Sequence, residues 1–254
     1  MFDLSNVDLV WLLLFIAVGF IAQVVDGALG MAFGVISNTL LISLGVPPAA
    51  ASASVHTIKN FTGAASGLSH VLHRNVDWRL FWRLLLPGMA GGIIGAYLLT
   101  RIDAEVAKPV VLAYLSCIGV YLLVRGIRFP PVEKKPKVVE PLGFLGGFLD
   151  AAGGGGWGPV VTSNLLVQGA NPRMVVGTVN TAEFFLAVTI TITFFASLGL
   201  EAIGPAALGL LIGGLAAAPF GAYFAKHISA KLMLVMVGIV LTATSIFGLW
   251  MSLT

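Results

Sequence analysis

The sequence predicts an all-α, polytopic integral membrane protein of about ten helical segments, arranged as two inverted repeats with broken helices at the membrane midplane. Of its 254 residues, 58% are hydrophobic and only 10% are charged, whereas soluble domains carry about 25% charged residues. Uncharged runs such as Val10 to Val25 and Leu232 to Thr254 approach or reach the roughly 20 residues that a helix needs to cross the bilayer. A series of residues from the first half of the chain also recurs, in the same order, in the second half.

The apolar runs define the predicted segments. Their ranges are 10–25, 29–44, 48–73, 81–100, 105–125, 142–152, 157–168, 172–198, 205–225 and 230–251. The polar stretch 126–140, which carries Lys134, Lys135 and Lys137, divides them into two sets. We therefore expect a first five-segment repeat at 1–125, a cytoplasmic linker at 126–140 and a second five-segment repeat at 141–254.

Matching residues in the two halves support the repeat. Asp26 and Asp150 are separated by 124 positions (150 − 26), and so are several glycines, prolines and aromatic residues. The further matches at this spacing are Gly34 with Gly158, Gly45 with Gly169, Pro48 with Pro172, Thr57 with Thr181, and Phe61 with Phe185. Because each repeat has an odd number of segments, consecutive repeats must have opposite orientations in the membrane, as in many secondary transporters.

The loop charges predict the orientation. If the lysine-rich linker is cytoplasmic, as the positive-inside rule requires, the loop with Arg74, Arg79 and Arg83 is cytoplasmic too, and both termini are non-cytoplasmic. No Lys or Arg precedes the first apolar stretch, so we interpret it as a retained helix rather than a signal peptide. We expect a multi-pass protein of the cell membrane, such as a bacterial inner membrane.

Glycine-rich stretches interrupt the first two segments of each repeat. The segment 142–152 covers only about 16 Å, and Gly153 to Gly156 follow it. Consecutive glycines disfavour continuous helix. The first repeat has a milder counterpart from Asp26 to Gly30. We expect two broken hairpins near mid-membrane, where irregular backbone is tolerated if it lines a cavity or is buried in protein.

Lys59 is the most informative single residue. It lies about 16 Å along the segment that begins at Pro48, and therefore near the bilayer centre, where a charge is costly and marks a functional site by default. Its repeat equivalent is Glu183. One interpretation is a structural ion pair between the repeats. The other is a buried cation that faces an anionic substrate, with Glu183 as its partner or as a proton carrier.

Four polar residues neighbour this pair. His56 lies three residues before Lys59 and shares its helix face, and Asn180 has the same relation to Glu183. Thr57 and Thr181 are adjacent to them. His56 either bonds two helices together or contacts a ligand and titrates near neutral pH.

The second segment of each repeat completes the candidate substrate site. Asn38 and Asn164 either bind helices together or donate hydrogen bonds to an oxyanion. Helix N-termini that follow the breaks present N–H groups and a positive dipole end to an anion. Gly154, Gly155 and Trp157 lie at the second break, where the glycines allow close approach to the backbone.

Asp26 and Asp150 lie at the C-terminal ends of the half-helices, where a carboxylate is electrostatically disfavoured. We expect them to cap neighbouring N–H groups. They could instead carry protons or bind a cation. Together with Glu183 they form the candidate set for coupling or structural roles.

The sequence favours neither an enzyme nor a nucleic-acid-binding protein. His70 and His73 lack a clustered carboxylate or cysteine, so no metal site is expected, and the glycine run lacks the Lys-Ser/Thr of a phosphate loop. The basic residues lie in short loops, which membrane topology explains. No cofactor, catalytic residue or nucleic-acid partner is predicted, and the expected partners are the lipid bilayer and a small anion.

The duplicated pattern resembles the TauE/SafE family of membrane permeases, the sulfite exporters and their relatives. The resemblance covers nearly the whole chain and rests on Gly19 to Gly34, Pro48 to Thr62 and their second copies. It implies export of sulfite or a related sulfur-containing anion such as an organosulfonate, by alternating access. Two alternatives remain: a proton- or sodium-coupled cation carrier that uses Asp26, Asp150 and Glu183, and an intramembrane enzyme or scaffold.

Overall fold

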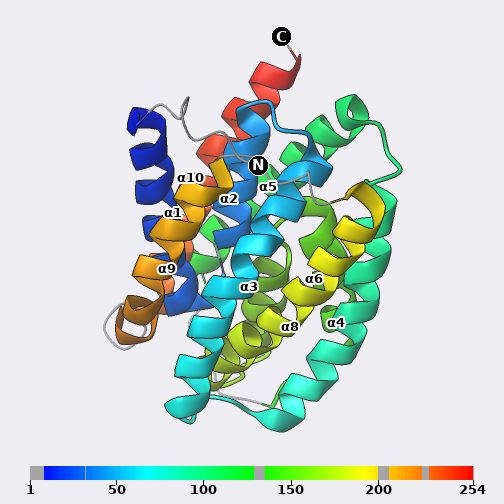
Figure 1. Ribbon diagram of the computed structural model, residues 1–254. Helices are drawn as coiled ribbons and strands as arrows, with labels where there is room; N and C mark the ends of the chain where they lie inside the picture. Colours follow the sequence, from blue (N-terminus) through cyan, green and yellow to red (C-terminus); the bar gives the residue numbers. More distant parts are fainter. Residues whose placement is uncertain (1–8, 32, 129–134, 200–205, 225–228, 254) are drawn as a thin grey trace.

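The computed structural model describes residues 9–31, 33–128, 135–199, 206–224 and 229–253, and every regular element in these ranges is helical (Figure 1). The elements are α1 (Leu9–Leu29), α2 (Phe33–Ser43), α3 (Pro48–Leu72), α4 (Trp78–Leu99), α5 (Ala104–Arg128), α6 (Glu140–Gly153), the π-helix η2 (Trp157–Thr162), α7 (Ser163–Val167), α8 (Pro172–Leu198), α9 (Ala206–Phe224) and α10 (Ala230–Leu253). The all-α prediction is confirmed, with segments close to the predicted ranges.

The apolar character of the helices fits a membrane environment. Within the described residues, three helical stretches are long and apolar enough to cross a bilayer, at Trp78–Leu99, Pro109–Arg128 and Arg173–Leu198. Shorter apolar stretches occur in α1, α2 and α9. Large apolar side chains such as Ile192 and Phe247 are more than half exposed, which is the arrangement that lipid contact favours.

One helix boundary differs from the sequence prediction for a clear reason. Helix α4 begins at Trp78 rather than at position 81. The side chain of Asp77 accepts hydrogen bonds from the N–H groups of Arg79 and Leu80, so this acidic residue caps the helix and extends it toward the loop.

Both predicted interruptions are present. Helix α1 ends at Leu29 and α2 begins at Phe33, while α6 ends at Gly153 and η2 begins at Trp157. Gly30 and Gly154 occupy equivalent positions, with φ of +65° and +69°, a left-handed conformation that glycine adopts without a Cβ penalty. The sequence predicted the first break to start near Asp26, but the helix continues three residues beyond it.

The two interruptions pack directly against each other. A Cβ on Gly34 would collide with the carbonyl oxygen of Gly154, and a Cβ on Gly158 would collide with that of Gly30. A side-chain bond joins the same segments, because the Thr162 hydroxyl donates to the Gly30 carbonyl at 3.0 Å. The absence of side chains at these positions therefore lets backbone meet backbone at the centre of the molecule.

Two apolar cores flank this centre. One includes Phe33, Leu112 and Leu210 and joins α1, α2, α3, α5 and α9. The other includes Phe81 and Trp157 and joins α3, α4, α6, η2 and α8. In Figure 1, α1 and α9 lie together on one side, α4 and α6 on the other, and α3 and α8 between them. Helix α3 contributes to both cores and carries Lys59.

The predicted orientation depends partly on Lys134 of the linker, which lies outside the described ranges. The cytoplasmic position of the linker and the non-cytoplasmic position of both termini stay predictions.

Candidate functional site

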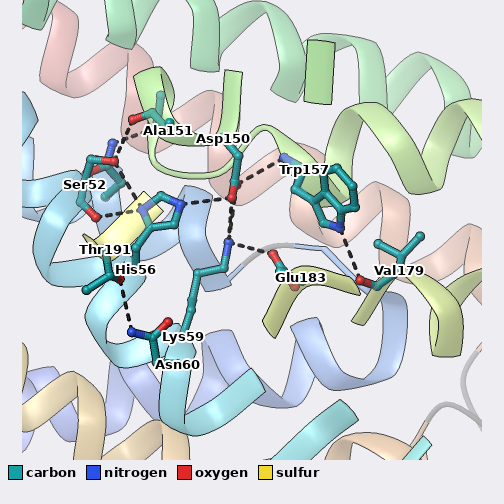
Figure 2. A network of polar contacts seen from close by, with 12 residues as sticks. Ser52, His56, Lys59, Asn60, Asp150, Ala151, Trp157, Val179, Glu183 and Thr191 are labelled. Carbon is teal, nitrogen blue, oxygen red and sulfur yellow. Dashed lines mark hydrogen bonds and ion pairs between the residues drawn. The ribbon is translucent and has the colours of Figure 1, made fainter. Parts of the chain in front are cut away.

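A buried cluster of charged side chains lies where α3, α6 and α8 meet (Figure 2). Lys59 on α3 places its Nζ 2.6 Å from Glu183 Oε1 on α8. The same Nζ lies 3.3 and 3.2 Å from the two carboxylate oxygens of Asp150 on α6. Lys59 is 3% exposed and Asp150 fully buried. The predicted ion pair between Lys59 and Glu183 is confirmed, and Asp150 is a second partner that the sequence did not identify.

Asp150 is the centre of this cluster because three donors converge on its carboxylate. Lys59 contacts both oxygens, and the backbone N–H of Trp157 donates to Oδ1 at 3.1 Å. The imidazole Nε2 of His56 lies 3.0 Å from Oδ2. Charge-assisted hydrogen bonds of this kind are about twice as strong as neutral ones, so these contacts offset much of the cost of burying a carboxylate.

The other nitrogen of His56 indicates where protons lie. Nδ1 is 2.8 Å from the backbone carbonyl oxygen of Ser52, and a carbonyl only accepts, so Nδ1 carries hydrogen. The other ring nitrogen, Nε2, faces Asp150 Oδ2, which is also an acceptor. Both nitrogens of His56 are therefore placed against acceptors. Ser52 also ties α3 to α6, because its hydroxyl donates to the Ala151 carbonyl at 2.7 Å.

Trp157 connects the site to α8. Its side chain is completely buried, and its indole Nε1 donates to the Val179 carbonyl at 3.2 Å. Its backbone N–H, at the start of η2, is the one that Asp150 accepts. Single π-helical turns are frequent at functional sites, and here the turn positions this N–H beside Lys59 and His56.

Asp26 caps the first break in the same way. Its Oδ1 accepts a hydrogen bond from the Phe33 N–H at 3.2 Å, and the corresponding bond from Trp157 to Asp150 also spans seven residues. The capping expected of both aspartates is confirmed. Asp26 is buried and within electrostatic range of Lys59 and Asp150, but it makes no direct bond to Lys59.

Asn38 and the glycines lie at the second break. The Asn38 amide donates to the Gly153 carbonyl at 2.7 Å, a bond between the two halves. A Cβ on Gly154 would collide with the Asn38 side chain, and one on Gly155 with the backbone of Val35. In this conformation the lack of side chains at Gly154 and Gly155 lets α2 pack directly against the second break. Anion binding by Asn38, Gly154 and Gly155 stays a prediction.

The remaining candidates point their polar groups elsewhere. Thr57 and Thr181 each donate to a carbonyl four residues earlier in their own helix, at 2.8 and 2.7 Å. Asn164 of α7 donates to the Val160 carbonyl of η2 at 2.7 Å. The Asn180 amide nitrogen lies 3.1 Å from His70 Nε2. The structure does not bring these four side chains into the Lys59 cluster, and their role in substrate binding is a prediction without further support.

Sequence reasoning missed Ser52 and Tyr114. Ser52 lies four residues before His56 on the same helix face, which was a usable signal. The buried Tyr114 hydroxyl has no hydrogen-bond partner within the described part of the chain. Its ring lies beside Gly153, where a Cβ would be 2.9 Å from Tyr114 Cε1. Nothing in the repeat pattern marks Tyr114. Among the described residues, no group of metal-ligating side chains is assembled.

The family model described as sulfite exporter TauE/SafE matches residues 15–248. The probable membrane transporter protein YtnM of Bacillus subtilis (strain 168) is 42% identical over 255 residues, which cover 96% of this chain and 85% of the relative. No solved structure matches the chain.

Proposed function

This chain belongs to the sulfite exporter TauE/SafE family of membrane transporters, and we propose that it exports a small sulfur-containing oxyanion, sulfite or an organosulfonate, by alternating access. The observation that carries the proposal is the position of Lys59, a fully buried cation at the junction of the two halves. A charge retained in such surroundings is a functional site by default.

The donors around Asp150 support an oxyanion as substrate. Lys59 Nζ, His56 Nε2 and the Trp157 N–H all lie within 3.3 Å of one carboxylate. Sulfite and sulfonate groups each present three oxygens on one sulfur atom and accept the same charge-assisted bonds. The Lys59 ammonium supplies positive charge and the Trp157 N–H supplies a directional hydrogen bond. Both recognise the oxygens of the anion rather than its central atom. The site therefore fits a compact oxyanion.

Equivalent packing in the two halves supports an arrangement as inverted repeats. A Cβ on Gly19 of α1 would lie 2.5 Å from the carbonyl oxygen of Leu210 on α9. The equivalent Gly143 of α6 has the same relation, at 2.6 Å, to Leu84 of α4. In this proposal each broken hairpin packs on the fourth segment of the other half, α9 for the first hairpin and α4 for the second. Rocking of one half against the other would alternate access to the Lys59 cluster.

Flux measurements test the proposal. Purified protein in liposomes should transport radiolabelled sulfite or methanesulfonate faster than sulfate or chloride, and protein-free liposomes give the background. Lys59→Met should reduce this flux to background. Equal flux of all four anions, or a fully active Lys59→Met variant, would contradict an oxyanion site at Lys59.

A cation carrier is the second candidate, and one observation favours it. Among the described residues, three carboxylates lie buried near a single lysine: Asp26, Asp150 and Glu183. Excess negative charge of this kind attracts a proton or sodium ion. Sodium-22 uptake that needs no anion would support the carrier, whereas anion flux that needs no sodium would support the oxyanion transporter.

The proposed transporter resides in the cell membrane with both termini non-cytoplasmic. Reporter fusions at Thr254 and Lys135 test this orientation. An external signal at Thr254 and a cytoplasmic one at Lys135 are expected. A cytoplasmic signal at Thr254 would contradict the inverted-repeat arrangement.

A further inference from the structure

The hydrogen-bond donors best suited to bind an oxyanion are already bonded to a carboxylate of the protein itself. Lys59, His56 and the Trp157 N–H are all bonded to the carboxylate of Asp150 (Figure 2). A carboxylate has the charge and the oxygen spacing of a small oxyanion. An external anion must therefore compete with Asp150 for these donors.

We propose that Asp150 is an internal competitor of the substrate: an oxyanion replaces its carboxylate on Lys59, His56 and the Trp157 N–H, and Asp150 takes up one proton for each monovalent anion bound. This inference rests on the proposed function and names its coupling ion. The proton comes from the solution on the side from which the anion enters, and it is released when the carboxylate returns to the donors.

Charge balance requires the proton. Exchanging one anion for another on the three donors leaves the donors equally neutralised, but the displaced carboxylate adds one negative charge to a buried cluster. Asp150 is fully buried, and Glu183 is 5% exposed. An unpaired buried charge costs several kcal/mol, and a carboxyl group in such a position takes up a proton instead. Binding of the anion and binding of the proton are therefore linked, and each strengthens the other.

The surroundings of Asp150 supply no other charge that could replace the proton. Among the described residues, the titratable groups that face it are His56 and Lys59 from α3, Glu183 from α8, Asp26 from α1 and Tyr114 from α5. On α4, which packs on the other side of α6, Arg83 is paired with Glu140 at the opposite end of α6. The two nearby cationic donors are those that the anion itself would use.

His56 gives the proton a defined place. Its Nδ1 lies against the Ser52 carbonyl oxygen and its Nε2 against Asp150 Oδ2, so an imidazolium would have an acceptor for each N–H group. In the proposed exchange the imidazolium donates to the arriving anion through Nε2, and the proton taken up neutralises Asp150. The pair thus works as a proton acceptor next to the anion, whereas Asp26 has no such partner.

Calorimetry of the purified full-length protein tests the inference. Methanesulfonate, which stays ionised at all usable pH values, is titrated in two buffers of different ionisation enthalpy, so that both Kd and the protons taken up per anion are measured. The wild type should take up about one proton, and above the carboxyl's titration range its Kd should weaken about ten-fold per pH unit. Asp150→Asn should bind with no uptake and with a Kd independent of pH.

Asp26→Asn is the matched control, since Asp26 caps a helix in the same way without touching the donors. It should keep the proton uptake of the wild type. Asp150→Ser, which also preserves an N-cap acceptor, serves if Asp150→Asn does not fold. If sulfite binds and methanesulfonate does not, uptake in the Asp150 variant is subtracted from that of the wild type, which removes sulfite's own titration.

The outcomes are separable. Anion binding by the wild type without proton uptake overturns the inference, and so does unchanged uptake in the Asp150 variants. In both cases the proposed function stands if anion flux persists. Failure of the wild type to bind or transport either anion overturns the proposed function itself.

Discussion

The two breaks are built alike but have different surroundings. At each, an aspartate accepts a hydrogen bond from the N–H seven residues later, at 3.2 Å for Asp26 with Phe33 and 3.1 Å for Asp150 with Trp157. Only Asp150 also bonds Lys59 and His56. Glu183 and Asn180, which lie 124 positions after Lys59 and His56, carry no positive charge.

This difference shows how two breaks of similar geometry can support a single charged site. The cap maintains the break in both halves, and a neutral acceptor could serve that purpose. The charge of Asp150 has a second use because α3 brings a lysine and a histidine to it. Substitutions that separate capping from charge should therefore affect the two halves unequally.

Lys59→Met should have the largest effect. The substitution keeps the volume but leaves Glu183 and Asp150 without their shared cation. Removing one partner of a buried ion pair costs about 3–5 kcal/mol. We expect a large fall in the melting temperature in detergent, together with loss of anion flux.

The double variant Lys59→Met with Glu183→Gln separates structure from binding. Removal of both charges should recover much of the lost stability but not the flux, because the anion still lacks its cation. Thermal melting and flux are measured on the wild type, Lys59→Met, Glu183→Gln and the double variant. Wild-type flux in the double variant would rule out a direct role of Lys59 in substrate binding.

Asp150→Ala against Asp26→Ala tests the asymmetry of the breaks directly. Loss of Asp150 removes the cap and leaves His56 and Lys59 without a partner, so we expect a cost near that of a broken buried ion pair, about 3–5 kcal/mol. Loss of Asp26 removes mainly a cap, which costs about 1 kcal/mol. Melting in detergent compares them. Equal losses would mean that the bonds of Asp150 to α3 add nothing to stability.

Gly34→Ala and Gly158→Ala test what the breaks share. In each variant the new Cβ would meet a carbonyl oxygen of the other break, and overpacking of this kind costs about 1–3 kcal/mol. Because the two contacts are equivalent, the melting temperatures should fall by similar amounts. A fall confined to one variant would argue against equivalent packing of the two halves.

The sequence alone predicted the helical class, the segments and both breaks, because long apolar runs and clustered glycines are local signals. It also identified Lys59 and Glu183 as partners, since a charge at mid-depth needs one. It did not identify Asp150 as the second partner of Lys59, because that contact depends on how α3 crosses α6. No local pattern encodes the crossing of two helices whose residues lie 91 positions apart.

The predicted ligands that did not join the cluster show the same limit. Thr57 and Thr181 each bond a carbonyl in their own helix, which hydroxyl groups in helices often do. Proximity to Lys59 or Glu183 in sequence did not decide the direction of these side chains. His56 did join the cluster, because its position three residues before Lys59 places it on the same face.

The smallest expected effect is at the surface, where the two halves differ again. Arg83 donates two hydrogen bonds to Glu140, at 2.5 and 3.0 Å, and thereby joins α4 to the start of α6. At the equivalent crossing of α9 with α1, Gly209 lies so close that a Cβ would be 2.5 Å from that of Phe15. The crossing of α4 with α6 is joined by an exposed ion pair, and the crossing of α9 with α1 by close packing of a glycine on a phenylalanine. Exposed pairs contribute about 0–1 kcal/mol, so Arg83→Gln should lower the melting temperature only slightly and leave the flux unchanged. Gly209→Ala should cost more stability, about 1–3 kcal/mol.

High salt should reduce the effect of Arg83→Gln and not that of Gly209→Ala, because salt screens exposed charges and leaves packing intact. A large, salt-independent loss in Arg83→Gln would show that this pair sets the position of α6, and with it that of Asp150.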